Sequence, residues 1–178
     1  MLIQLKIWNL LLGKQGYKTI KTDKIFPKNG QVSGAQGGII QIVSQTFSTQ
    51  ATSTSTSWSS TGLEATITPQ SASNKILIQV SGPMTGFAGG SGDQRGGLKI
   101  YRGGSGGTSV ESSSNGLSCQ YGIPSQYSDV HILFLDSPAT TSATTYTVMM
   151  SRRSGDTTYS FIRDGNQTGS IILMEVSA

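Results

Sequence analysis

The chain has 178 residues, of which only 12% are charged, while serine, threonine and glycine together account for 70. Apolar runs recur at strand spacing, which argues against disorder, and the length suffices for one domain with a real core plus a small appendage. Residues 1–37 carry six lysines and one aspartate, whereas residues 38–178 carry seven basic and eight acidic residues. Because the basic character is confined to the first segment, we do not expect a nucleic-acid-binding face on the domain.

Residues 1–16 form an apolar segment that is too short for a membrane span, which needs about 20 residues. It also lacks the positive region and the small-residue cleavage site of a signal peptide. The spacing fits a strand through Ile3, Leu5 and Ile7, yet Leu5, Trp8 and Leu12 fit a helix equally well. Such side chains cannot be buried within the segment, so they must pack on the domain, on sister arms or on another protein. We interpret the segment as an anchoring arm, with docking residues Ile3, Leu5, Ile7, Trp8 and Leu11.

Residues 17–37 are polar and punctuated by glycine, and Pro27 and Asn29-Gly30 prevent a continuous helix. This composition predicts an extended neck, and Gly37-Gly38 marks the boundary to a head domain of residues 38–178.

The head contains short runs rich in β-branched residues and separated by turn residues, which predicts eight or nine strands. The glycine-rich stretch Gly82–Gly97 is expected to be a loop, as is Gly103–Gly107, and Trp58 is expected to belong to the core. The strands are predicted over Ile39–Val43, Leu63–Thr68, Lys75–Val80, Leu98–Arg102, Val130–Leu135, Thr144–Met150, Thr157–Ile162 and Ser170–Val176.

The final third, from Val130 to Ala178, is predicted to be a β-meander of four consecutive strands. Its last run, Ile171–Val176, is apolar on both faces up to Glu175, so it should lie inside a sheet or an interface. The pattern as a whole predicts an antiparallel β-sandwich or jelly roll.

The single cysteine, Cys119, and the single histidine, His131, exclude an internal disulfide and offer no metal-ligand set. We expect Cys119 to be a small, at least half-buried residue and His131 to be a strand residue without a chemical role. No metal and no cofactor are expected.

Several blocks of the head resemble a known family. The order TGLEATITPQSASNKILIQVSG, LKIYRGG, LDSPATTSATTYTV and a final SIILMEV is similar to the C-terminal domains of fibre and fibre-like virion proteins of tailed phages, especially phages of marine bacteria and cyanobacteria. The segments GGIIQIVSQTFST and TIKTDKI resemble the stretches that precede those domains. The likeness extends over residues 18–178 and is specific in Leu135–Val148 and Ile171–Val176.

The resemblance implies a jelly-roll head of the TNF/C1q-like trimer type on a short fibre, or a protein that decorates the capsid or the tail. The homotrimer would assemble in the host cytoplasm, contact other virion proteins through residues 1–37, and expose its head on the particle for host attachment. No membrane insertion is implied.

Two alternatives remain besides this interpretation. The head could be a carbohydrate-binding module that uses Trp58 or the predicted loop residues Asp93, Arg95, Tyr121 and Tyr127, or the chain could be a monomeric capsid cement protein. An enzyme is not expected, because the aspartates available for glycosidase chemistry lie at positions that aspartate adopts for turn geometry alone. The head contains Asp129, Asp136, Asp156 and Asp164, and the turn positions are those of Asp136, Asp156 and Asp164.

Overall fold

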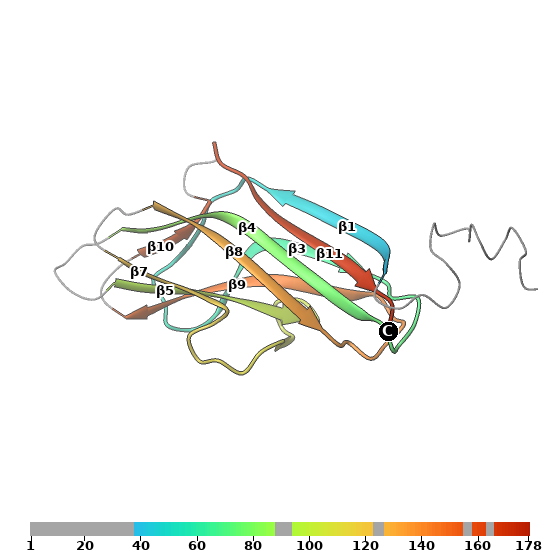
Figure 1. The fold of residues 1–178 in the computed structure, drawn as a ribbon. Helices are drawn as coiled ribbons and strands as arrows, with labels where there is room; N and C mark the ends of the chain where they lie inside the picture. Colours follow the sequence, from blue (N-terminus) through green and yellow to red (C-terminus); the bar gives the residue numbers. More distant parts are fainter. Residues whose placement is uncertain (1–37, 88–93, 123–126, 155–157, 163–165) are drawn as a thin grey trace, which may run out of the picture.

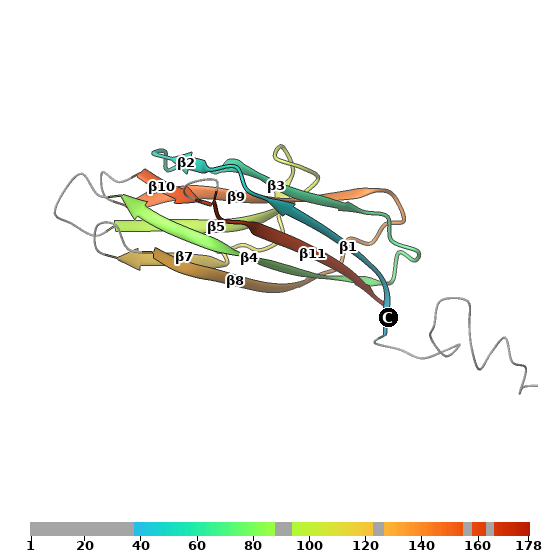
Figure 2. The ribbon, with the colours of Figure 1, turned by 90° about the horizontal axis from the view of Figure 1, so that it is seen from above.

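The computed structural model describes residues 38–87, 94–122, 127–154, 158–162 and 166–178. Within these ranges the chain forms eleven strands in two antiparallel sheets that pack face to face (Figure 1 and Figure 2). The predicted all-β sandwich is therefore confirmed. Residues 1–37, to which the sequence assigns an arm and a neck, lie outside the described ranges.

The first sheet, which we call the β4 sheet, is built around its longest strand. One edge of β4 pairs with β8 along residues 76–85, and the other edge pairs first with β11 and then with β10. Strand β1 pairs with β11 and strand β2 pairs with β10. Beside β4, the pair β10–β2 therefore follows the pair β11–β1 along the direction of the strands. The strands are β1 (Ile39–Phe47), β2 (Ala51–Ser53), β4 (Lys75–Phe87), β8 (Tyr127–Asp136), β10 (Thr158–Phe161) and β11 (Gly169–Val176).

The second sheet, the β9 sheet, has the order β3-β9-β5, and β6 and β7 share the remaining edge of β5. Its strands are β3 (Ser59–Ile67), β5 (Gln94–Arg102), β6 (Thr108–Ser109), β7 (Ser118–Gly122) and β9 (Thr144–Ser154). Strand β7 was not predicted, because residues 110–129 carry little apolar alternation.

Figure 2 shows β1, β11, β4 and β8 in this order across one layer of the sandwich. This layer faces β3, β9, β5 and β7. The chain passes from one layer to the other between β2 and β3, β3 and β4, β4 and β5, β7 and β8, β8 and β9, and β9 and β10. That arrangement is a jelly roll. The predicted C-terminal meander is therefore wrong. Strands β8 to β11 do not pair with one another, because each finds its partners in earlier parts of the chain.

The core lies between the layers, and burial alternates along strands such as β3 and β11. In β3 every second residue from Thr61 to Ile67 is buried, and the residues between them are exposed. The fully buried aromatic side chains are Tyr146, Tyr159 and Phe161. Strand β11 lies between β1 and β4, as the two apolar faces of its sequence predict.

The expectation that Gly82–Gly97 is a loop is wrong at both ends, because β4 continues to Phe87 and β5 begins at Gln94. The glycines make room for the aromatic rings of β10. A Cβ atom at Gly96 would lie 2.2 Å from the Tyr159 ring, and one at Gly82 would lie 2.8 Å from the Phe161 ring. Close packing therefore explains these glycines better than turn formation does.

Candidate interaction surface

The structure places the residues singled out from sequence in different settings. Arg95 and Tyr121 are cross-strand partners in β5 and β7, and Tyr127 begins β8 opposite Thr85. These three positions are therefore in strands and not in loops, although the register brings Arg95 and Tyr121 together. Asp93 and the five arm residues Ile3, Leu5, Ile7, Trp8 and Leu11 lie outside the described ranges.

The most distinctive surface of the described residues is the outer face of the β4 sheet, which carries an apolar row. The register aligns Ile42 of β1, Met174 of β11, Leu77 of β4 and Leu135 of β8 in one line across the sheet. Ile42 is 60% exposed and Leu135 is 48% exposed, while Leu77 and Met174 are half-buried. A chain with this few charges thus presents an apolar line to solvent.

The next line along the strands extends the apolar surface. It contains Ile172 of β11, Gln79 of β4 and Leu133 of β8, and Leu133 is the most exposed large hydrophobic side chain described, at 68%. A hollow on this face is lined by Gln79, His131 and Leu133. We call Ile42, Leu77, Leu133, Leu135, Ile172 and Met174 the apolar face.

Along the strands the apolar face ends in polar residues on one side, while on the other side Lys75 lies in line with Val176 and with Ile39, which is 49% exposed. At one end Ser81 and Ser170 share a hydrogen bond of 2.9 Å, and the exposed His131 lies beside them on β8. Lys75 and Asp129 lie at opposite ends of this face, since Lys75 begins β4 and Asp129 pairs with Pro83. The exposed polar residues Ser44 and Gln79 also lie on this face, in line with Ile172 and Leu133. An exposed cluster of large apolar residues bordered by polar ones is typical of a protein interaction site.

The apolar face was not predicted from the sequence, although the sequence of β8 contains an indication of it. Strand β8 reads His-Ile-Leu-Phe-Leu-Asp and is apolar on both faces, as is β11. Such a strand is expected to be covered on both sides, and the structure shows no cover over the outer side of β8 within the described residues. His131 lies in strand β8, as predicted, and its side chain is exposed on this face. The prediction that the last strand lies inside a sheet is confirmed for β11.

A buried carboxylate holds one end of this sheet together. Glu175 of β11 accepts hydrogen bonds from Asn74 Nδ2 at 2.6 Å, Gln41 Nε2 at 2.5 Å and the Gln70 backbone N–H at 2.7 Å. Burial acts to raise the pKa of Glu175, but the hydrogen bonds from Asn74, Gln41 and the backbone outweigh it and hold the pKa below its ordinary value. The carboxylate thereby ties β1, β11 and the turn before β4.

The same end of the sandwich receives the chain from its N-terminal side. The Gly38 N–H donates to Ser177 Oγ at 3.3 Å, and the Ser177 N–H donates to the Gly38 carbonyl at 3.0 Å. Figure 1 shows that β1 begins where β11 ends. Residues 1–37 therefore join the head at the edge of the β4 sheet, close to Ile42.

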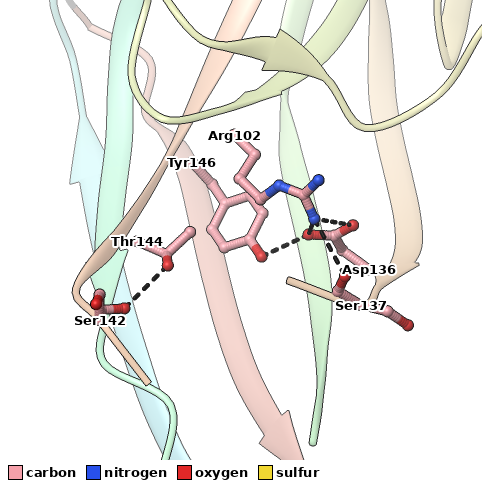
Figure 3. Close-up of polar contacts among 6 residues, drawn as sticks. All are labelled: Arg102, Asp136, Ser137, Ser142, Thr144 and Tyr146. Carbon is pink, nitrogen blue, oxygen red and sulfur yellow. Dashed lines mark hydrogen bonds and ion pairs between the residues drawn. The ribbon is translucent and has the colours of Figure 1, made fainter. Parts of the chain in front are cut away.

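A second buried carboxylate closes β8 and links the two sheets (Figure 3). Asp136 accepts a hydrogen bond of 2.7 Å from the Tyr146 hydroxyl of β9 and pairs with Arg102 Nη1 of β5 at 2.9 Å. Burial, together with the bond to Asp136, raises the pKa of Tyr146 far above its ordinary value. Arg102 also donates to the Ser137 carbonyl at 3.2 Å. Through these contacts Asp136 links β8 of one sheet to β5 and β9 of the other.

Trp58 lies on the opposite side of the sandwich, where it is half-buried outside the main core, contrary to the expectation. Lys99 Nζ lies 5.0 Å and Arg153 Cζ 5.6 Å from the ring centroid, within the range of cation–π attraction. Lys99 also pairs with Glu111 at 3.4 Å. The ring therefore covers the outer face of the β9 sheet beneath two cationic side chains.

Within the described ranges there is no group of three or more histidine, cysteine, aspartate or glutamate side chains that could hold a metal ion. Nor does this part of the chain contain a helix long and apolar enough to cross a bilayer. Asp156 and Asp164 lie outside the described residues.

No protein-family model and no curated protein matches the chain. Among solved structures, the chain is similar to the protein of T=1 particles derived from infectious bursal virus, with 13% identity, a TM-score of 0.40 and coverage of 85% of this chain and 39% of that one. The protein of the infectious bursal disease virus Gx strain gives 14% identity, a TM-score of 0.39 and coverage of 85% and 41%. The protein of the VP2 subviral particle of that virus gives 15% identity, a TM-score of 0.35, and coverage of 78% of this chain and 38% of that one. The chain spans about two fifths of these proteins, and matches at this level assign no function.

Proposed function

We propose that this chain is a non-catalytic structural protein of a virus particle, specifically a short trimeric fibre or a capsid or tail decoration protein of a tailed bacteriophage. The observation that carries the proposal is the apolar face, which gives a jelly-roll domain an uncovered surface suited to protein contacts. In the proposed particle, residues 1–37 dock onto other virion proteins, and the head is exposed for attachment to the host.

The sequence resemblance supports the proposal at the positions where it is specific. The block Leu135–Val148 contains the end of β8, the bonded pair Asp136 and Tyr146, and the first part of β9, and Ile171–Val176 forms most of the inner strand β11. Both blocks therefore build the frame of the jelly roll.

Particle location provides the direct test. Antibodies raised against residues 38–178 should label intact particles purified on a density gradient from a phage lysate that contains this protein. Substituting alanine at Leu5, Ile7 and Trp8 together should reduce incorporation into particles, because these side chains form the proposed dock. Protein found only in the soluble fraction, with no label on particles, would contradict the virion role.

Native mass tests the oligomer. Light scattering after size exclusion should give a trimer for the full chain. A monomer would exclude the trimeric fibre and favour the monomeric cement protein.

A second candidate function, carbohydrate binding, is favoured by the register that places Arg95 opposite Tyr121 at one end of the β5–β7 pair. An aromatic residue and a charged residue at paired strand positions are residue types suited to binding a sugar ring. A glycan array probed with the full chain and with a Tyr121→Ala variant tests this candidate. Equal signals for both proteins, or no signal for either, would reject it.

A further inference from the structure

Two apolar surfaces without a described partner occur in this one chain. The first is the apolar face of the β4 sheet, where Leu133 and Ile42 are 68% and 60% exposed. The second is the segment of residues 1–16, which carries eight large apolar side chains besides Met1: Leu2, Ile3, Leu5, Ile7, Trp8, Leu10, Leu11 and Leu12. We infer that, in the free protein, residues 1–16 cover the apolar face of their own head.

The connection between the two surfaces permits this contact. Residues 17–37 separate the segment from the head, and a chain of 21 residues can span at most about 70 Å. The head receives the chain at Gly38, which is fixed to Ser177 at the edge of the β4 sheet, four positions before Ile42. The sheet is only about 20 Å across, from the usual spacing of four strands, so the reach far exceeds the distance required.

The size of the face argues against a second head as the cover. Four strand positions of about 4.8 Å and seven residues of about 3.3 Å give roughly 440 Å² per copy, or about 900 Å² for two. Stable interfaces usually bury about 1,200–2,000 Å² in total, so two heads packed through this face alone would associate weakly. A segment tethered to the same chain instead has an effective concentration in the millimolar range.

The chemistry of the two surfaces is also compatible. The charged residues of this face, Lys75 and Asp129, lie at its ends, and its centre is uncharged. The apolar side chains of residues 1–16 can therefore pack on it without burying a carboxylate or an ammonium group. A segment laid on a sheet face forms an additional layer, which is a common way to cover such a surface.

This arrangement adds a control step to the proposed function. While residues 1–16 lie on their own head, neither apolar surface is free to bind prematurely. The contact in the free chain can nevertheless be tested without any particle, so a failure here is separate from a failure of the virion role.

Cysteine cross-linking in the full chain tests the inference. In a Cys119→Ser background, Leu5→Cys and Leu133→Cys are combined and treated at low protein concentration with a short bismaleimide. The matched control combines Leu5→Cys with Thr66→Cys, because Thr66 is exposed on the opposite outer face. Leu133 is itself exposed, so its replacement leaves the fold intact.

The inference predicts a cross-linked product of monomer mass for the Leu5–Leu133 pair, several-fold above the Leu5–Thr66 control. A product of dimer mass would show that another copy covers the face and would overturn the inference. Equal yields for both pairs, or no product, would overturn it as well. As a second measurement, Leu5→Asp with Ile7→Asp should raise the binding of a hydrophobic dye by the full chain, whereas unchanged dye binding would contradict the cover.

Discussion

Replacing Glu175 by glutamine should lower the free energy of unfolding by about 2 kcal/mol, because a buried charged acceptor contributes about 1.5–3 kcal/mol through its hydrogen bonds. The carboxylate accepts from Asn74, Gln41 and the Gln70 backbone, and Asn74 is buried. Glutamine has nearly the same shape as glutamate and keeps one acceptor oxygen, but its NH2 group would point at one of these donors and could not accept a hydrogen bond from it. Gln41 and Gln70 are partly open to water, which limits the loss.

The pH dependence of this effect follows from the lowered pKa. Since the pKa of Glu175 in the folded protein lies below its ordinary value of 4.5, the stabilisation is fully present above that pH and is lost as the pH falls through the folded pKa. The difference between the natural protein and Glu175→Gln should therefore be constant at neutral pH and shrink below pH 4.5.

Urea denaturation between neutral and acidic pH measures both effects. The matched control is Glu64→Gln, since Glu64 is exposed and accepts one hydrogen bond, from Thr147 at 2.9 Å. Its substitution should change stability by less than about 0.5 kcal/mol. Equal losses for the two variants, or a Glu175→Gln difference that does not vary with pH, would refute the account of Glu175.

Three further substitutions test the packing, and urea denaturation measures each. Gly96→Ala should lower the free energy of unfolding by about 1–3 kcal/mol, because its Cβ would lie 2.2 Å from the Tyr159 ring. Gly106→Ala, whose Cβ would have no atom within 4 Å, should leave the stability nearly unchanged. Equal effects of the two substitutions would contradict the close packing. Asp136→Asn should lower the free energy of unfolding by about 2 kcal/mol. This is less than the usual loss of about 3–5 kcal/mol for a broken buried ion pair, because the Arg102 side chain is partly exposed. An unchanged midpoint of urea denaturation would contradict this prediction. In a chain that also carries Leu5→Asp and Ile7→Asp, so that residues 1–16 do not cover the face, Leu133→Ser should lower the free energy of unfolding by less than about 1 kcal/mol, because the side chain is 68% exposed on the head. A larger loss would show that something other than residues 1–16 buries this side chain.

The strands themselves could be predicted from the sequence, because a half-buried strand needs alternating side chains. Lys75–Val80, Val130–Leu135 and Ser170–Val176 all fall within strands of the structure. Strand ends were less predictable where glycine is frequent. Gly82 and Gly96 read as loop residues, yet they lie in β4 and β5, because the missing side chains accommodate rings from β10, which is more than 60 residues away in sequence.

The candidate surface could be predicted only in part. The sequence indicates that β8 and β11 are apolar on both faces, but it cannot indicate whether the second face is covered. It also cannot align Ile42, Leu77, Leu135 and Met174, since these residues come from four separate segments of the chain.

The sequence by itself thus determined an all-β sandwich and its principal strands, because side-chain alternation is a local property of each strand. The tertiary structure alone decided the jelly-roll pairing that replaces the predicted meander, since hydrogen-bonding edges are alike in every strand and partners are selected by the packing of the whole core. The same pairing placed Glu175 among its three donors and assembled the apolar face, because both depend on residues that only the folded chain brings together.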